Sequence, residues 1–221
     1  MDLLVLALAI PDVRPGRSTA VHLSRFCAGS PLAFAVNDQG PAAAFTALRI
    51  VRDYQRTGGC RRAVVLVAEQ ASLHYTPPVP VRVPDRHVAV ALVCEESSAP
   101  ELTVHQATSV QPESVAGLVA GQLAVLGAEA VLVAGAGLPG TAQAGAAAAR
   151  SVDAPAGQPL TGVWSELAAR LPQWRSQGRP VLVADYDPVL GLLGMAGFHP
   201  AADPGSAPVA LPAADQALAG R

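Results

Sequence analysis

The stretch Asn37-Asp38-Gln39-Gly40-Pro41-Ala42-Ala43-Ala44-Phe45 joins a polar turn to a long amphipathic segment, and it decides how the rest of the chain is interpreted. Beyond the turn, apolar side chains recur at the spacing of a helix. They are Ala44, Leu48, Val51 and Tyr54. Arginines occupy the other faces, and the pair Gly58-Gly59 that follows is typical of a helix end. The pattern predicts a helix over about 41–56.

Short apolar runs bounded by proline, glycine or charged residues predict strands before and after this helix. They span 3–9, 32–36, 63–68, 87–94, 102–107, 130–134 and 180–184, and one more is expected near 208–211. Two further helical patterns cover about 112–126 and 162–174. Strands that alternate with helices predict an α/β layered fold with mainly parallel sheets.

The polar segment 95–100 is the best internal boundary, because a fresh strand pattern follows it. It divides the chain into one half at 1–96 and another at 97–221. Each half contains a strand, a helix and a strand in similar order, which suggests a duplicated unit.

Composition excludes several classes of function. Only 14% of the 221 residues are charged, and the net charge is −2. All 15 basic residues are arginine, with no basic run longer than Arg61-Arg62, so neither a nucleic-acid site nor a membrane-surface site is expected. The apolar stretch 115–138 contains Gln122, Glu129 and several glycines, which predicts a helix, a turn and a strand rather than a membrane span.

The three cysteines, Cys27, Cys60 and Cys94, are an odd number without the spacing of metal ligands. A disulfide framework and a structural zinc are therefore not expected. The apolar run at 1–10 carries Asp2 where a signal peptide needs a basic residue, so it is predicted to be a buried strand. We expect a cytoplasmic protein without a metal or a cofactor.

The segment 37–53, followed by 61–69, resembles the nucleophile region of thiolase-superfamily condensing enzymes, in particular ketosynthase III and type III polyketide synthases. The segments 2–7 and 83–92 resemble neighbouring strands of the same family. The resemblance covers about Asp2 to Cys94 in the family's order. It implies a thiolase-like fold that is shortened at its N-terminus, because the chain begins near the family's third strand.

At the position of the family's nucleophilic cysteine, which follows Gly40, this sequence has Pro41. The family's cysteine begins a helix whose dipole lowers the pKa of the thiol. Proline suits the first turn of a helix but carries no nucleophile. The resemblance therefore implies that the helix is kept and that condensation is not.

The second half resembles the family less closely. The segment 133–140 resembles the loop that carries the family's histidine, with Ala134 at the place of that base and Gly137 among the loop glycines. Thr161 lies near the place of the family's second histidine or asparagine. The segment 181–191 resembles the final strand and glycine loop.

Two functions remain open from these residues. The first is a non-condensing auxiliary protein of polyketide or fatty-acyl biosynthesis, similar in role to the chain-length-factor partners of ketosynthases. It would bind a ketosynthase, a carrier protein or an acyl chain. Missing opening strands would leave a sheet edge or a core face uncovered, so the resemblance implies a homodimer or a heteromer with a ketosynthase-like chain.

The second is an acyl-processing enzyme that uses acid and base groups in place of a thiol. Its candidates are His74, Glu69, Asp185 and Asp187. The two aspartates follow an expected strand at its C-terminal end, where α/β sheets place ligands. His74 also has a structural interpretation as a solvated or hydrogen-bonded histidine, and the two aspartates have one as an Asp-Pro turn.

A third possibility, a dinucleotide site, ranks last. Residues 135–140 match the pattern GxGxxG, and Asp153 lies where a ribose-binding acid could be. However, the separation is short, no apolar strand is expected before Asp153, and Pro139 lacks an N–H for a phosphate.

Overall fold

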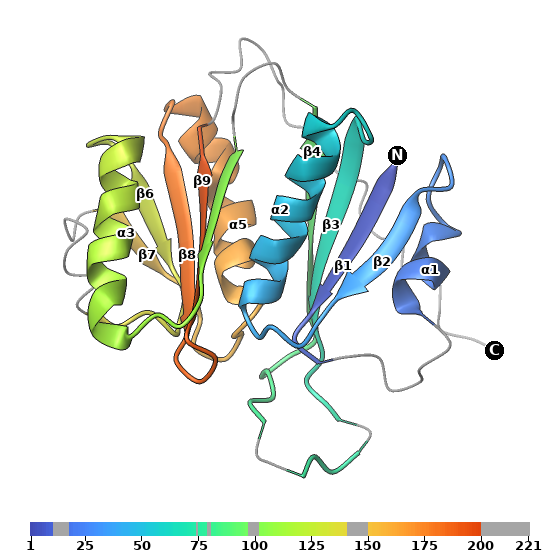
Figure 1. Ribbon diagram of the computed structural model, residues 1–221, viewed down its shortest axis with the longest axis horizontal. Helices are drawn as coiled ribbons and strands as arrows, with labels where there is room; N and C mark the ends of the chain where they lie inside the picture. The colour runs from blue at the N-terminus through green and yellow to red at the C-terminus, as the bar shows by residue number, and fades with distance from the viewer. Residues whose placement is uncertain (11–17, 74, 79–80, 97–101, 141–149, 200–221) are drawn as a thin grey trace.

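Two β-sheets enclose a pair of helices in a computed structural model that describes residues 1–10, 18–73, 75–78, 81–96, 102–140 and 150–199 (Figure 1). The first sheet has the order β2-β1-β3-β4. Its strands are β1 (Leu3–Leu8), β2 (Leu32–Val36), β3 (Arg62–Glu69) and β4 (Val88–Glu95). The second sheet has the order β5-β9-β8-β6-β7. Its strands are β5 (Leu102–Ala107), β6 (Val131–Ala134), β7 (Ser151–Asp153), β8 (Val181–Asp187) and β9 (Leu192–Phe198).

The layers follow one another as helix, sheet, helix pair, sheet and helix (Figure 1). The middle layer consists of α2 (Ala42–Arg56) and α5 (Gly162–Ser176). The outer layers are α3 (Pro112–Leu126) over the second sheet and α1 (Thr19–Ser24) beside β1 and β2. The expected α/β layered architecture is present.

The helix α2 is buried because small side chains allow both sheets to approach it. Its first turns contribute Ala42, Ala43, Ala44 and Ala47, all of which are buried. Phe45 lies among them and contacts Trp164 of α5, with ring centroids 5.0 Å apart. Both rings are fully buried in an apolar cluster that draws side chains from both sheets. The two sheets therefore share one core.

The two sheets repeat one topology. In the first, β1 pairs in parallel with β2 and β3, and β3 pairs antiparallel with β4. In the second, β6 pairs in parallel with β7 and β8, and β8 pairs antiparallel with β9. The helices α2 and α5 each connect the second strand of a repeat with its third, and each has 15 residues. The second sheet has in addition β5, which pairs antiparallel with β9.

The structure adds three elements to those expected from the sequence: α1, β7 and β9. The sequence pattern predicts no strand over the span of β9, in which Gly194 and Gly197 lower the strand propensity. Both glycines have packing reasons, since a Cβ at Gly194 would overlap the ring of Phe45 and one at Gly197 would meet the hydroxyl of Thr103. The strand expected near 208–211 lies outside the described residues.

Candidate functional site

The C-terminal ends of the central parallel strands and the N-termini of α2 and α5 lie at one end of the molecule, at the bottom of Figure 1. A tight turn at residues 38–41, which we call the elbow, leads from β2 into α2 there. Asp38 and Gly40 adopt left-handed backbone angles, with φ of 60° and 50°. Gly40 also faces the Asp187 carboxylate, which leaves no room for a Cβ. The elbow therefore packs directly against the end of β8.

Pro41 lies at the N-cap of α2, with φ of −63°, and makes no side-chain capping bond. The first helical amides are engaged by the turn, because Ala42 N donates to Gln39 O at 3.0 Å and Ala43 N donates to Gly40 O at 3.3 Å. A proline suits this position because its missing N–H would have no partner within the helix. The turn at the start of a helix is present, and the side chain at its apex has no acid, base or nucleophile.

A polar cluster that was not predicted ties the elbow to the second half. Thr46 Oγ1 donates to Gln39 Oε1. The amide of Gln106, on β5, donates to Thr46 Oγ1 at 2.8 Å and to Ala42 O at 3.3 Å. Gln39 and Thr46 lie seven residues apart, but Gln106 is sixty residues beyond Thr46, so only the fold reveals this cluster.

Asp187 stabilises the turn between β8 and β9. Its Oδ1 accepts from Val189 N at 2.9 Å and from Leu190 N at 3.0 Å, in an Asx-type arrangement. Its Oδ2 faces Gly40. The structure therefore brings Asp187 to the elbow, and it is the one candidate acid that touches this turn among the described residues.

Asp185 lies two residues earlier on the same face of β8. It is 4% exposed, and its Oδ1 accepts from Tyr186 N at 2.8 Å and from Gly137 N at 3.2 Å. Burial raises its pKa to about 7, although the two backbone amides and the charge of Arg82 oppose the rise. At neutral pH this carboxyl is close to half protonated, the state that suits transfer of a proton in either direction.

Gly135 and Gly137 lie against the end of β8. A Cβ at Gly135 would overlap the Asp185 carboxyl, and one at Gly137 would overlap the carbonyl of Tyr186. Asp153 does end a strand, since β7 pairs with β6 and places Asp153 opposite Ala134, contrary to our expectation that no strand precedes it. In a dinucleotide site, glycines at such positions let a phosphate group approach the backbone. Here Gly135 and Gly137 instead let the loop after β6 pack against the end of β8.

Ala134, which the resemblance compares with the family's histidine, is the last residue of β6 and is 1% exposed. Its side chain belongs to an apolar cluster with Leu138 and Leu182. Its carbonyl accepts from Ala154 N at 2.8 Å. This position supplies packing and no base.

Glu69 and Thr161 meet at the start of α5. Glu69 Oε1 accepts from Leu160 N at 2.7 Å, and its Oε2 accepts from Thr161 N at 2.8 Å and from Thr161 Oγ1. Gln158, a residue that the sequence did not single out, adds a bond from Nε2 to Glu69 Oε2 at 3.2 Å. We call these three residues the α5 clamp. Because four donors occupy the carboxylate of this buried glutamate, the clamp joins β3 to the second half.

His74 lies outside the described residues. Of the other predicted positions, Gly40, Pro41 and Asp187 form one contact group, Asp185 and Gly137 a second, and Glu69 and Thr161 a third. Within the described ranges, no group of three or more histidine, cysteine, aspartate or glutamate side chains could hold a metal ion. No helix in the described part of the chain is long and apolar enough to cross a membrane.

The cysteines do not replace the missing nucleophile. Burial raises the pKa of Cys60, and it raises the pKa of Cys94 to about 11. Both thiols are therefore protonated at neutral pH and unreactive. Cys27 follows α1, where its Sγ lies 3.5 Å from Leu23 O, and all three cysteines are free.

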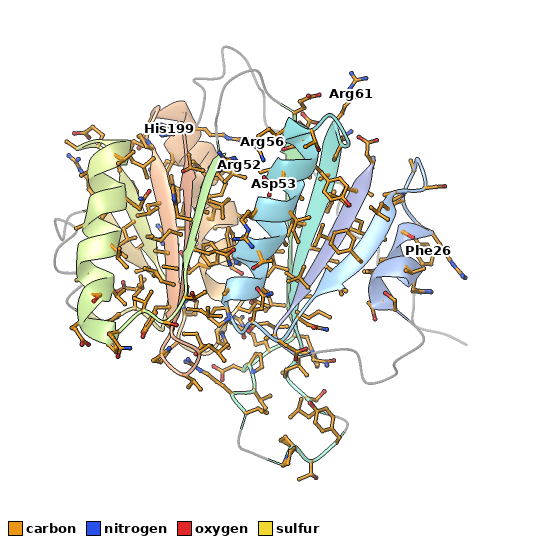
Figure 2. All side chains as sticks on the ribbon, in the orientation of Figure 1. Phe26, Arg52, Asp53, Arg56, Arg61 and His199 are labelled. Atoms are coloured by element: carbon orange, nitrogen blue, oxygen red, sulfur yellow. The ribbon has the colours of Figure 1, made fainter. Side chains whose placement is uncertain are left out.

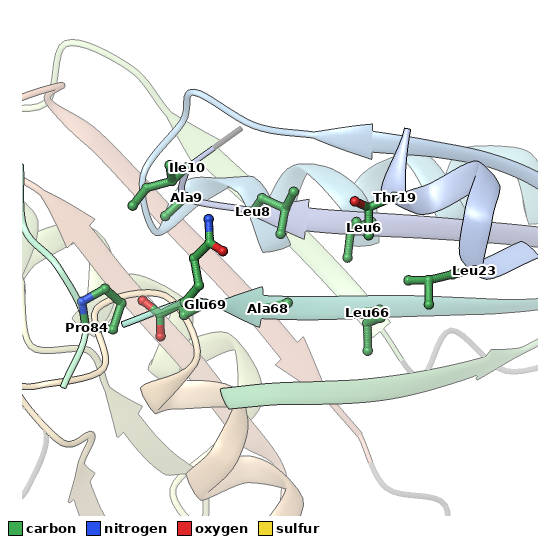
Figure 3. Close-up of a pocket in the computed structure, with 11 residues that line it drawn as sticks. Leu6, Leu8, Ala9, Ile10, Thr19, Leu23, Leu66, Ala68, Glu69 and Pro84 are labelled. Atoms are coloured by element: carbon green, nitrogen blue, oxygen red, sulfur yellow. The ribbon is translucent and has the colours of Figure 1, made fainter. Parts of the chain in front are cut away.

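An apolar cavity of about 230 Å³ lies on the outer face of the first sheet, between β1, β3 and α1 (Figure 3). Leu6, Leu8, Leu23 and Leu66 line it, and Glu69 borders one end. Neither Pro41 nor Asp185 is among its lining residues. This cavity is therefore separate from the elbow.

No family model matches the sequence, and no curated protein matches it. Solved structures do match the fold. A 3-oxoacyl-[acyl-carrier-protein] synthase III from Aquifex aeolicus VF5 is 14% identical, with 90% of this chain and 77% of that chain covered and a TM-score of 0.67. The tetronic acid condensing enzyme AbyA1 is 19% identical, with coverage of 89% and 79% and a TM-score of 0.64. The acyltransferase ChlB3 is 16% identical, with coverage of 91% and 79% and a TM-score of 0.64.

The chain has a thiolase-like fold of the ketosynthase III type, so the fold expected from the elbow sequence is confirmed. Identities this low establish the fold alone.

Proposed function

We propose that this protein is a non-condensing, ketosynthase-like auxiliary protein of polyketide or fatty-acyl biosynthesis. It would bind a ketosynthase, a carrier protein or an acyl chain in the cytoplasm. The observation that carries the proposal is Pro41 at the apex of an otherwise intact elbow. Ala134 and Thr161, at the other two family positions, are engaged in packing and in the α5 clamp. A scaffold that keeps the turn and loses the reacting groups suits binding better than catalysis.

Covalent acylation is the direct test. We expect no mass increase when the purified protein is incubated with acyl thioesters of coenzyme A or of a carrier protein, and no carbon–carbon bond formation. We expect the protein to co-purify with a co-expressed ketosynthase-like chain or to bind an acylated carrier protein by calorimetry. An acyl adduct on any side chain, or condensation by the chain alone, contradicts the proposal.

The variant Pro41→Cys tests whether the elbow retains its activating environment. A thiol at the N-terminus of α2 is expected to have a lowered pKa and to react with iodoacetamide at pH 7 about ten times faster than an exposed thiol. Thr57→Cys, at the C-cap of the same helix, is the matched control because the helix dipole there has the opposite sign. Equal rates in the two variants contradict the interpretation of residues 38–41 as a former nucleophile turn.

A second candidate function rests on Asp185, whose raised pKa and burial fit an acid or base in an acyl-processing reaction. If this enzyme exists, hydrolysis of an acyl thioester follows an ionisation near pH 7, and Asp185→Asn lowers the rate at least 100-fold. Asp53→Asn is the matched control, since Asp53 is exposed on α2, away from the elbow (Figure 2). A rate that is unchanged in Asp185→Asn excludes this function.

A further inference from the structure

The outer faces of the two sheets are built alike but covered differently. When the pair Leu3 and Ala63 of the first sheet is aligned with the pair Val131 and Val181 of the second, positions 63–69 of β3 and 88–94 of β4 acquire counterparts on β8 and β9. The outward side chains of β8 and β9 are Leu182, Ala184, Tyr186, Leu193 and Met195, and each is at most 4% exposed. Their counterparts are Val64, Leu66, Ala68, Ala89 and Ala91. Both faces are therefore apolar.

In the second half, one strand–helix unit provides the cover. The strand β5 extends the sheet through six residue pairs with β9, and α3 follows it. Val115 and Val119 of α3 join the buried cluster on the outer face of the sheet. Gly197 lies directly under this unit, where a Cβ would meet Thr103 and Leu126.

In the first half, the corresponding surface is open among the described residues. Ala89 and Ala91 on β4 are exposed, Val93 is 57% exposed, and Leu66 and Ala68 on β3 are only partly buried. The outer edge of β4 is paired with no strand in the described part of the chain. We call this surface, formed by Val64, Leu66, Ala68, Ala89, Ala91 and Val93, the β3–β4 face. Apolar surface next to an unpaired strand edge is typical of an interface.

We propose that the β3–β4 face binds a different polypeptide, which adds a strand antiparallel to β4 and packs an amphipathic helix across β3 and β4. The inference goes beyond the proposed function, because it uses only the comparison of the two halves. The partner would supply a strand followed by a helix, as β5 and α3 do in the second half. One face of that helix would carry apolar residues.

A second copy of this chain does not fit the description. Its β5 and α3 are already folded against its own second sheet, and no other strand–helix unit is unpartnered among the described residues. The proposal therefore names a different chain as the occupant, and a crosslink within the same polypeptide would contradict it.

Site-specific photo-crosslinking of the full chain, in the cells that produce it, tests this. A benzophenone side chain at position 93 is expected to join the protein to one other polypeptide, within a segment in which alternating apolar residues precede a helical apolar stripe. The same probe at position 26 is the control, because Phe26 is 77% exposed on the first half but lies beyond α1, away from β4 (Figure 2). We expect no equivalent product from that position.

Two variants that introduce a charge test whether the crosslink depends on the β3–β4 face. Ala91→Glu places a carboxylate at the centre of the β3–β4 face and is expected to lower the yield of the crosslink at least tenfold. Val125→Glu introduces a carboxylate on the solvent side of α3, where Val125 is 77% exposed. This variant should leave the yield of the crosslink unchanged. Because both positions are exposed, both variants should fold, which circular dichroism checks.

Four outcomes overturn the inference: a crosslink to a second copy, a crosslink within the same polypeptide, equal yields at positions 93 and 26, and no product at all. A crosslinked partner that is neither a ketosynthase-like chain nor a carrier protein supports the β3–β4 face and counts against the proposed function. Acylation of the wild-type protein contradicts the proposed function and leaves the inference about this face unchanged.

Discussion

Two buried carboxylates in this molecule have different surroundings, and the difference separates their roles. Glu69 accepts four hydrogen bonds, one through Oε1 from Leu160 N and three through Oε2 from Gln158 and Thr161, so both of its oxygens are engaged. Asp185 accepts through one oxygen only, and burial raises its pKa to about 7. Glu69 thus resembles a structural anchor, whereas Asp185 retains an oxygen and a proton that chemistry or pH can use.

The pH dependence of stability follows from the direction of this pKa shift. Because the pKa of Asp185 is about 7 in the folded protein, above its ordinary value of 3.8, the native state binds more protons than the unfolded state between these pH values. The free energy of unfolding should therefore fall as the pH rises from about 4 to 7, and then level off. Asp185→Asn removes this loss and should be more stable than the wild type at pH 8, by about 2 kcal/mol or more.

Urea unfolding at pH 4 and at pH 8 measures the effect. We expect the variant and the wild type to converge at pH 4, where the aspartate is protonated in the native state. Asp53→Asn should reproduce the wild-type profile, since Asp53 is exposed. Parallel profiles for Asp185→Asn and the wild type would show that the buried carboxyl is not the cause.

At the scale of elements, the elbow could be predicted from the sequence because its information is local. A polar turn, a proline at the first helical position and an apolar stripe lie within twenty residues, and they predict α2 to within one residue of its observed start. The strand β9 could not be predicted, because its two glycines are explained only by Phe45 and Thr103, which lie far away in sequence. The contact of Asp187 with Gly40 has the same long-range character.

The start of α5 depends on a side chain from the other half, which gives a prediction at this scale. Glu69→Gln replaces an acceptor by an amide whose N–H group must face donors from Thr161 or Leu160. We expect a loss of about 2–4 kcal/mol in the free energy of unfolding at pH 7. The control is Glu95→Gln, on an exposed end of β4 with an exposed partner, Arg62.

Urea titration of the two variants gives the comparison. If Glu69→Gln is as stable as Glu95→Gln, the α5 clamp does not stabilise the fold. A third variant, Thr161→Val, removes one of the four donors and should lose about 1 kcal/mol, which places the hydroxyl group within the same set of bonds.

On the scale of the whole molecule, the sequence predicted the layered class and the thiolase-like fold, and both are confirmed. The loss of condensation at Pro41 stays a prediction. The resemblance implied that a sheet edge or a core face is left uncovered, but it did not say where. The β3–β4 face is located only when β3 and β4 are aligned with β8 and β9. The alternating pattern of Val64, Leu66 and Ala68 is ordinary for a strand. Only the absence of an α3 counterpart among the described residues makes the pattern informative.

The ring of Phe45 fills the space that a side chain at position 194 would need, and this contact constrains how the sequence can evolve. The ring from one repeat fills a space that exists because the other repeat has no side chain there. Neither repeat can then be copied, exchanged or recombined with a relative's repeat unless positions 45 and 194 are inherited together. Chimeras joined between the sheets should succeed only when the donor offers a matching pair of large and small residues at these two sites.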